Sequence, residues 1–534
     1  MSHETCWEQS TPLMNFSPLL ENVTTDVCII GAGIAGMMTA YHLSREGKSV
    51  VVIDAASVGG GQTQNTTAHL TNAIDDRYAA IERWHGSEGA KLAAQSHSAA
   101  IDRIELIVTE EKIDCDFERL NGYLFAPPEH SPNLLDDELR AARAAGLTVE
   151  PLLRAPLPKF FTGPALCFPR QAQFHPMKFL HGLADAIVRR GGRIFNHTRV
   201  QGVEAISDET SHGSAGSTRS TPSLRVKIQG DIKITANDVV VATNSPINDM
   251  FVIHTKQAAY LTYVVGFPVA RGSIEKALYW DALDPYHYVR LVEITSNPDE
   301  KTSAGATPSQ QMLIVGGEDH KTGQADDSAD RFARLATWAR ERFPVTGEPD
   351  IRWSGQVMET MDGLAFIGKN PMDNPHVYIA TGDSGMGMTH GSIAGMLLTD
   401  LIIGRPNAWA ALYDPTRKSV RAADVFLEEN FNVMRQYATW VTPGEVASID
   451  EIPAGHGAIM RHGLSKLAIY RDPHGAVHTR SAVCPHLGCL VNWNGLDKTW
   501  DCPCHGSRFD TDGQAICGPA CSGLAPAETP VVIA

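Results

Sequence analysis

Two short segments near the C-terminus contain the residue types that bind transition metals. Each segment offers two cysteines and one histidine: Cys484, His486 and Cys489 in the first, and Cys502, Cys504 and His505 in the second. Two thiolates with two imidazoles suit a [2Fe–2S] cluster in which histidines replace two cysteines on one iron. The same donors also suit zinc. Zinc-finger spacing groups cysteines with cysteines and histidines with histidines, however, whereas this chain interleaves them, which favours the cluster.

The spacing of these residues resembles that of the Rieske family of iron–sulfur domains. That resemblance implies a ligand set of Cys484 and Cys502 on the inner iron and His486 and His505 on the outer iron. It also implies a disulfide between Cys489 and Cys504, because the disulfide-bearing branch of the family links its two cluster loops in this way. By the same resemblance, the histidine edge of the cluster is partly exposed and serves as the exit for electrons.

Two further positions bear on the reduction potential of such a cluster. Ser507 stands where the Rieske family has a serine that donates a hydrogen bond to a bridging sulfide. Phe509 stands where many high-potential members have a tyrosine whose hydroxyl bonds a ligand sulfur. Because hydrogen bonds to the sulfurs raise the potential, we predict a value below the respiratory type and above an all-cysteine ferredoxin.

A dinucleotide-binding pattern lies near the N-terminus. An apolar run of strand length ends in G-x-G-x-x-G, formed by Gly31, Gly33 and Gly36, and a helical stretch follows. A second β-branched strand then ends at Asp54. In this setting the glycines allow a tight turn, close approach of a pyrophosphate and close packing of helix on strand. Asp54 is placed to accept a hydrogen bond from a ribose hydroxyl.

Later segments favour FAD over NAD. Residues 362–368 and 377–391 resemble the C-terminal flavin-contacting segment of the D-amino-acid oxidase (DAO) superfamily, in which a glycine-rich loop leads into a helix. Residues 59–69 occupy the place of that superfamily's flavin loop after the second strand. The resemblance implies further FAD contacts at Thr66, Thr67, Val200, Gly385, Gly387 and Met388. We interpret His69 as a non-covalent site residue or a structural one, and covalent attachment of FAD stays open.

The candidate substrate-pocket residues are Tyr286, Tyr288 and Arg290, which lie on one predicted strand. Alternation along a strand places these three side chains on one face. An arginine beside tyrosines could bind a carboxylate through two parallel hydrogen bonds. A cluster on the sheet surface or an interdomain salt bridge is the alternative interpretation. No paired carboxylates and no nucleophile triad stand out, so the sequence names no catalytic residue.

These patterns predict an α/β FAD-binding domain, Rossmann-like and of the DAO type, with an inserted antiparallel substrate-binding sheet, followed by an all-β Rieske domain. The predicted parts are an N-terminal arm at 1–23, the oxidoreductase domain at 24–425 with its substrate sheet at about 250–345, a linker at 426–443 and the Rieske domain at 444–534.

Composition limits the partners. The formal net charge of −16 argues against nucleic acid or an anionic membrane as a partner. No stretch is apolar for long enough to cross a membrane. The first residues lack a basic segment followed by an apolar one, so we expect a cytoplasmic protein. Its expected partners are a small-molecule substrate and a redox protein or other electron acceptor.

The resemblance implies an FAD-dependent oxidoreductase that oxidises an amine or amino acid at the flavin. Because the flavin takes two electrons and the cluster passes one at a time, we expect single electrons to reach an external acceptor through the cluster. One alternative is a reductase- or ferredoxin-fed enzyme in which the cluster reduces the flavin for a reductive or oxygenating reaction. Another is a non-enzymatic electron-transfer or redox-sensing protein. The substrate, redox partner, oligomeric state and cluster potential are not specified by the sequence.

Overall fold

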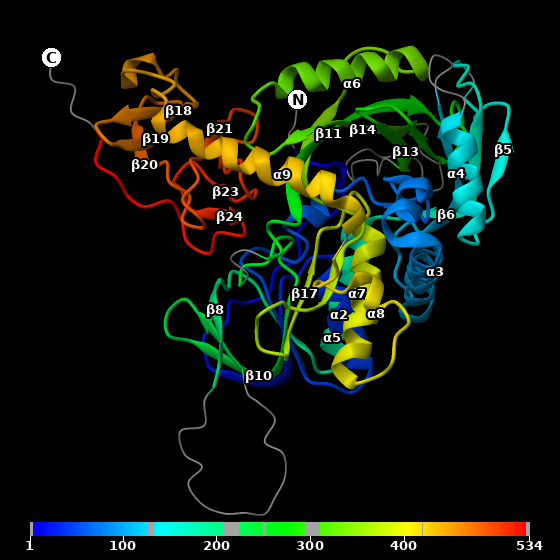
Figure 1. Ribbon diagram of the computed structural model, residues 1–534, viewed down its shortest axis with the longest axis horizontal. Coiled ribbons are helices and arrows are strands. Elements are labelled where there is room, and N and C mark those ends of the chain that lie inside the picture. The colour runs from blue at the N-terminus through cyan, green and yellow to red at the C-terminus, as the bar shows by residue number, and fades with distance from the viewer. Residues whose placement is uncertain are drawn as a thin grey trace, which may run out of the picture.

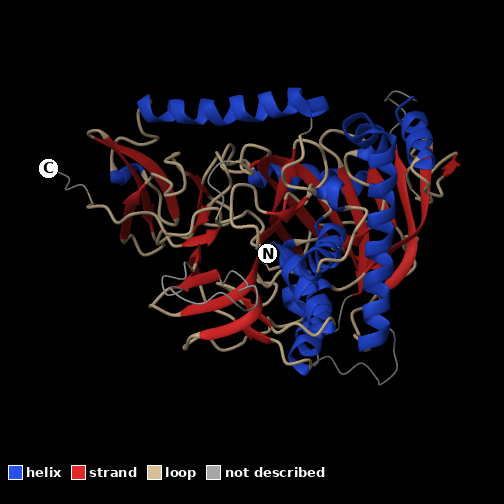
Figure 2. Cartoon of the chain, turned by 60° about the horizontal axis from the view of Figure 1, so that its bottom comes forward, coloured by secondary structure: helices blue, strands red, loops and turns tan. Residues whose placement is uncertain are grey.

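The computed structural model describes residues 4–126, 133–157, 159–206, 224–248, 252–293, 310–418 and 420–529. An N-terminal part contains two large sheets and most of the helices, and a smaller β module forms the C-terminal part (Figures 1 and 2). Among the described residues, no helix is long and apolar enough to cross a membrane.

The first sheet is the nucleotide-binding layer. Its strand order is β16-β17-β10-β1-β2-β7, with β9 beside β10 and β8 beside β9. The strands are β1 (Val23–Ile30), β2 (Val50–Ile53), β7 (Arg193–Phe195), β8 (Val200–Ala205), β9 (Leu224–Ile228), β10 (Lys233–Val241), β16 (Phe366–Lys369) and β17 (Val377–Thr381). The pairs β2–β7, β1–β2, β1–β10 and β10–β17 are parallel. Such strands are buried on both faces, which explains why β2 is an unbroken run of valine and isoleucine.

Helices cover this layer and the neighbouring sheet. They are α2 (Ile34–Arg45), α3 (Arg77–Glu111), α4 (Asn133–Ala144), α5 (Pro176–Arg189), α6 (Ser328–Arg342), α7 (Gly387–Ile403) and α8 (Ala410–Tyr413). Helices α2 and α7 pack closely, because Gly391 and Gly395 of α7 face Ile34 and Met38 of α2 and leave no room for a side chain. This packing brings the starts of both helices to the same end of the sheet.

The second sheet runs in the order β15-β11-β14-β13-β12-β4-β6-β3, with β5 beside β6. Its strands are β3 (His69–Leu70), β4 (Glu118–Phe125), β5 (Glu150–Leu152), β6 (Ala165–Gln173), β11 (Gln257–Ala270), β12 (Leu278–Asp281), β13 (His287–Glu293), β14 (Gln310–Lys321) and β15 (Ile351–Thr360). The range expected from the sequence, about 250–345, contains only β11 to β14. Strands β3 to β6 also join the sheet, because β4 pairs with β12.

The C-terminal module contains two small antiparallel sheets. One is β18 (His456–His462), β19 (Ser465–Arg471) and β20 (Val477–Ser481), and the other is β21 (Asn492–Asn494), β22 (Thr499–Asp501), β23 (Arg508–Phe509) and β24 (Ala515–Cys517). The buried aromatic rings of Trp493 and Trp500 pack together between the sheets, with 4.9 Å between their centroids.

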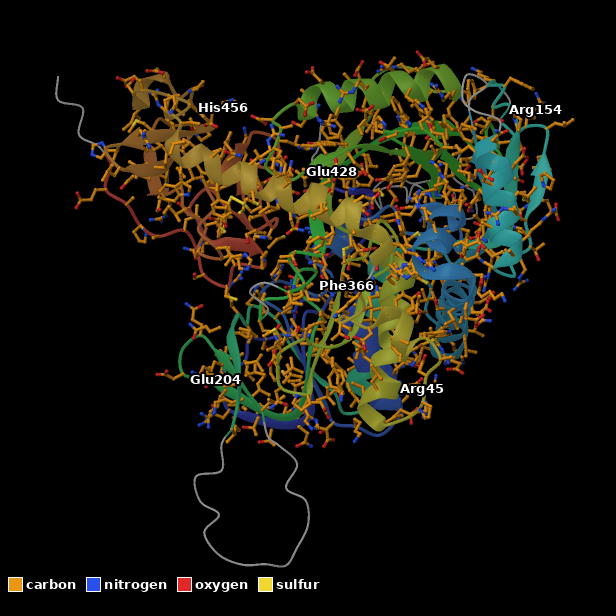
Figure 3. The ribbon with its side chains drawn as sticks, viewed as in Figure 1. Arg45, Arg154, Glu204, Phe366, Glu428 and His456 are labelled. Atoms are coloured by element: carbon orange, nitrogen blue, oxygen red, sulfur yellow. A yellow bond between two sulfur atoms is a disulfide. The ribbon has the colours of Figure 1, made fainter. Side chains whose placement is uncertain are left out.

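Helix α9 (Ala423–Gln436) connects the two parts and lies across their outer surface (Figure 1). Glu428 lies on this helix and His456 begins β18 in the module (Figure 3). Beyond α9, Tyr437 donates to the carbonyl of Leu487 and Trp440 to that of Gly488, so the connection is attached to the loop that carries the candidate ligands Cys484 and His486. At the other end of the chain, α1 (Cys6–Ser10) buries Trp7 in the core of the N-terminal part.

Candidate active site

The four candidate cluster ligands meet at the tips of two loops of the C-terminal module. The loop before β21 carries Cys484 and His486, and the loop between β22 and β23 carries Cys502 and His505. Both thiols are 1% exposed and share a hydrogen bond. The two imidazole rings lie 5.0 Å apart between centroids. The donor set therefore fits a cluster with thiolates on one iron and imidazoles on the other.

A disulfide joins Cys489 and Cys504. The sulfurs of these two residues and Cys502 lie within 4.8 Å of one another, a spacing that a metal ion could also use. Because two of the three sulfurs are bonded to each other, only that of Cys502 is available as a thiolate. The disulfide thus ties the two loops together and leaves Cys484 and Cys502 as the thiolate donors.

The histidine edge is partly exposed, because His486 is half-buried whereas His505 is buried. His505 is 7% exposed. The ring of His254, from the segment that precedes β11, lies 4.8 Å from that of His486 and 5.7 Å from that of His505. The two histidines therefore face the N-terminal part of the protein.

A cavity of about 680 Å³, lined mostly by the N-terminal part, lies within the size range of cofactor and ligand sites. Gly31 and Gly33 line it at the end of β1 and the start of α2. A Cβ at Gly31 would stand 2.3 Å from the carbonyl oxygen of Ala242, and one at Gly36 would stand 1.9 Å from that of Gly31. Gly36 lies outside the cavity lining and allows α2 to pack against β1. This backbone cradle at a helix N-terminus fits a dinucleotide.

The other candidate FAD contacts surround the same cavity. Its lining includes Asp54, Thr66, Thr67, Val200, Gly385, Gly387 and Met388. Both oxygens of Asp54 accept backbone hydrogen bonds, from Ala32 at 2.6 Å and Ala56 at 2.7 Å. Burial raises the pKa of its carboxyl group. Asp54 thereby fixes the glycine turn and still presents lone pairs to the cavity.

The three substrate-pocket candidates come from β13 and the residue before it, and only two of them reach the cavity. Tyr286 and Tyr288 line the cavity. Arg290 does not: its Nη1 donates to the carbonyls of Thr67 at 2.9 Å and Ala68 at 2.7 Å, and its guanidinium lies over the ring of Trp7. The suggestion that Arg290 clamps a substrate carboxylate is therefore wrong. Backbone carbonyls accept from both of its Nη atoms, and the residue anchors the loop that carries Thr66 and Thr67.

Acidic side chains also line the cavity, and no motif in the sequence predicts them. Asp75 and Asp383 line the cavity, and the hydroxyl of Tyr286 donates to Asp75 at 3.4 Å. Burial, together with Asp76 and Asp319 nearby, raises the pKa of Asp75 to about 8. Burial raises that of Asp383 to about 6. The two residues come from distant segments without a shared motif, so no pattern in the sequence indicates that they meet.

His69 completes the wall beside the tyrosines. Its Nδ1 lies 3.0 Å from the hydroxyl of Thr67, and its ring meets that of Tyr288 edge-on at 5.8 Å. Burial and the nearby Arg290 lower the pKa of His69 to about 3. The imidazole is therefore neutral at physiological pH and offers a hydrogen-bonding group without a charge.

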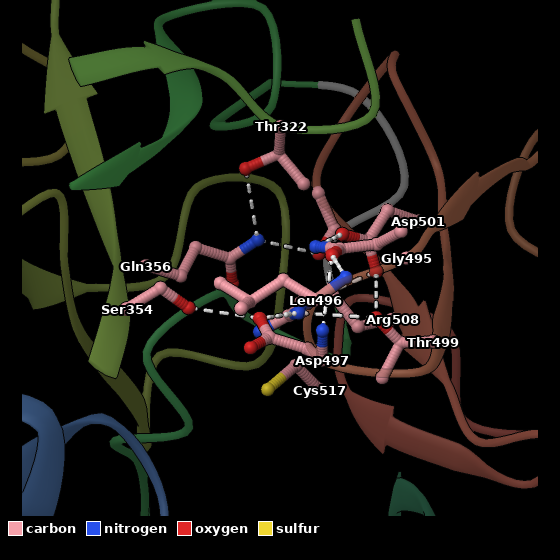
Figure 4. A network of polar contacts seen from close by, with 12 residues as sticks. Thr322, Ser354, Gln356, Gly495, Leu496, Asp497, Thr499, Asp501, Arg508 and Cys517 are labelled. Carbon is pink, nitrogen blue, oxygen red and sulfur yellow. Dashed lines mark hydrogen bonds and ion pairs between the residues drawn. The ribbon is translucent and has the colours of Figure 1, made fainter. Parts of the chain in front are cut away.

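The C-terminal module supplies part of the cavity wall. Its contributing residues are Arg508, Asp510, Gln514, Ala515, Ile516, Cys517, Gly518, Ala520 and Cys521. Arg199 donates to the carbonyl of Ala515 at 2.7 Å, and Ser354 donates to Asp497 at 2.8 Å (Figure 4). One cavity is thus enclosed by both parts of the chain.

Comparison with known families and proteins agrees with these observations. Residues 26–401 match the family described as FAD dependent oxidoreductase (DAO), and residues 442–528 match the Rieske [2Fe-2S] domain. The putative Rieske 2Fe-2S iron-sulfur protein YhfW of Bacillus subtilis (strain 168) is 29% identical over 525 residues, which cover 98% of this chain and 97% of that protein.

Two relatives resemble the N-terminal part. Gamma-glutamylputrescine oxidoreductase of Escherichia coli (strain K12) is 25% identical over 405 residues, 73% of this chain and 86% of that protein. The crystal structure of glycine oxidase from Geobacillus kaustophilus superposes with a TM-score of 0.55 at 17% identity, covering 74% of this chain and 100% of that chain. At this identity the superposition shows a common fold.

Proposed function

The chain belongs to the DAO family of FAD-dependent oxidoreductases and carries a Rieske [2Fe–2S] domain, and from this we propose that it is a dehydrogenase for amines or amino acids. In this proposal the substrate loses two electrons at a C–N bond, and the electrons leave singly through the cluster to an external acceptor. The observation that carries the proposal is the shared cavity, whose wall contains both the dinucleotide cradle and residues 508–521 of the Rieske domain.

The likeness to two enzymes supports the substrate class. Gamma-glutamylputrescine oxidoreductase and glycine oxidase are named for an amine and an amino acid, and both resemble the FAD-binding part of this chain. Bound FAD would supply the acceptor for a hydride, and the Rieske cluster would supply a one-electron carrier. The cradle at Gly31 and Gly33 would hold the first group, and the ligands described above would hold the second.

Side chains of the cavity wall around Tyr286 would position the amine and accept its proton. Hydride loss requires a neutral nitrogen, so a substrate ammonium must first release a proton. Asp383 and Asp75 are the cavity carboxyl groups that could accept it. Asp383, with a pKa of about 6, is ionised near neutral pH, whereas Asp75, with a pKa of about 8, becomes an acceptor only at higher pH. The neutral His69 and the hydroxyls of Tyr286 and Tyr288 offer hydrogen bonds for orientation.

The experiment is an anaerobic panel of amines and amino acids, followed by flavin absorbance and by electron paramagnetic resonance of the cluster. A substrate that bleaches the flavin and then produces the reduced Rieske signal would support the proposal. If no amine bleaches the flavin, and a chemically reduced cluster reduces it instead, electrons flow inward and the proposal fails.

A further inference from the structure

Gln356 touches both the flavin cavity and the metal-binding loop. It lies on β15, lines the cavity and is 3% exposed. Its side-chain Nε2 donates to the carbonyl oxygen of Gly506 at 2.9 Å. Gly506 follows the ligand His505 directly in the chain. One side chain therefore leads from the cavity wall to the backbone of the residue that follows a candidate ligand of the outer iron.

The surroundings hold this amide in place. Nε2 also lies 3.3 Å from the hydroxyl of Thr322, and the backbone N–H of Gln356 donates to Oε1 of Gln62 at 2.7 Å. A Cβ on Gly506 would stand 2.3 Å from the Cβ of Ala259 and 2.9 Å from Nε2 of Gln356. The glycine thus allows the Rieske loop to meet the FAD-binding part without an intervening side chain.

We propose that Gln356 couples the two redox sites, and that its hydrogen bond to Gly506 is the contact through which electrons reach His505. This inference rests on the proposed electron flow from flavin to cluster. Each oxidised C–N bond yields two electrons, which cross one after the other. Each crossing changes one iron from Fe(III) to Fe(II), and an external one-electron acceptor restores Fe(III) before the next crossing. The protons pass to water.

A second route is available through the segment after β24, which contains Ala520. Ala520 lines the cavity and its N–H donates to the hydroxyl of Ser507, which in turn bonds the thiol of Cys484. That route leads to the inner iron. The route through Gln356 leads to the outer iron, because Gly506 adjoins His505. A substitution at Gln356 interrupts this route and leaves the route through Ala520 in place.

The test measures electron transfer in the protein loaded with both cofactors, after rapid photochemical reduction of the flavin without any amine. Gln356→Met keeps the length of the side chain and removes its donor. Gln356→Asn keeps an amide but ends one methylene short of Gly506. We expect both variants to slow the appearance of the reduced Rieske signal by roughly tenfold, equivalent to about 1.4 kcal/mol in a barrier.

Ser354→Ala is the matched control. Ser354 lies two residues earlier on the same face of β15 and also bonds the Rieske domain, through Asp497, but it neither lines the cavity nor adjoins a ligand. It should leave the rate unchanged. All variants should share the cluster spectrum, the midpoint potential and the resistance of the interdomain connection to trypsin. A variant whose two domains no longer dock would differ in these properties.

A wild-type rate in either Gln356 variant, or equal slowing by Ser354→Ala, would overturn the proposal. Because light reduces the flavin, this outcome is independent of the amine panel. A protein that no amine reduces can still show the dependence on Gln356, so failure of the proposed function and failure of this inference are separate results.

Discussion

The imidazole ring of His254 lies edge-on against that of His486, with 4.8 Å between the ring centroids. His254 is buried and belongs to the FAD-binding part, whereas His486 is a candidate ligand in the Rieske domain. The contact covers part of the histidine edge, where His486 is half-buried. Solvent exposure is one of the factors that set the potential of an iron–sulfur cluster.

We therefore predict that His254→Ala raises the midpoint potential, because water entering the space would stabilise the additional negative charge of the reduced cluster. His254→Phe keeps a ring of similar size and should stay closer to the wild type. Redox titration followed by electron paramagnetic resonance measures both. Equal potentials in the wild type and His254→Ala would show that the ring does not shield the cluster.

Arg290 should prove important for FAD retention and stability. Arg290→Met removes buried charge-assisted hydrogen bonds to the loop of Thr67 and Ala68, each worth about 1.5–3 kcal/mol. We expect a lower melting temperature and loss of FAD on gel filtration. Arg405→Met, which removes an exposed ion pair with Glu46, should change little. If Arg290→Met keeps its stability and its FAD but has a raised KM for substrates with a carboxylate, then Arg290 binds the substrate carboxylate after all.

Local spacing explains what the sequence could predict. The cluster ligands lie within two short loops, and the three glycines of the dinucleotide motif lie within six residues, so each set appears as a motif. Arg290 was misassigned because its acceptors are backbone carbonyls of a distant loop, which no side-chain pattern reveals. The bond from Gln356 to Gly506 joins residues 150 positions apart and depends on how the two parts dock.

Asp75 should make the apoprotein less stable as the pH rises. Its pKa is about 8 in the folded protein and about 3.9 when unfolded. Between these values the unfolded chain releases a proton that the folded protein retains, so the free energy of unfolding falls with increasing pH by up to about 1.4 kcal/mol per unit. Asp75→Asn should therefore lose less melting temperature between pH 5 and pH 8 than the wild type. Parallel curves for both proteins would contradict the raised pKa.

Phe509 offers a test of how hydrogen bonding tunes the cluster. It is fully buried and packs in one cluster of residues with Cys484 and Cys502. A hydroxyl introduced by Phe509→Tyr should donate to a ligand sulfur and raise the midpoint potential. A bond of about 1 kcal/mol corresponds to roughly 40 mV, since a tenfold change in a one-electron equilibrium is about 59 mV.

Ser507→Ala is the comparison variant: it removes the hydroxyl that bonds the thiol of Cys484 and should lower the midpoint potential. Phe509→Tyr could leave the midpoint potential unchanged while Ser507→Ala lowers it. That result would show that the new hydroxyl does not reach a sulfur. The low potential expected of this cluster would then come from the surrounding protein and not from the missing tyrosine.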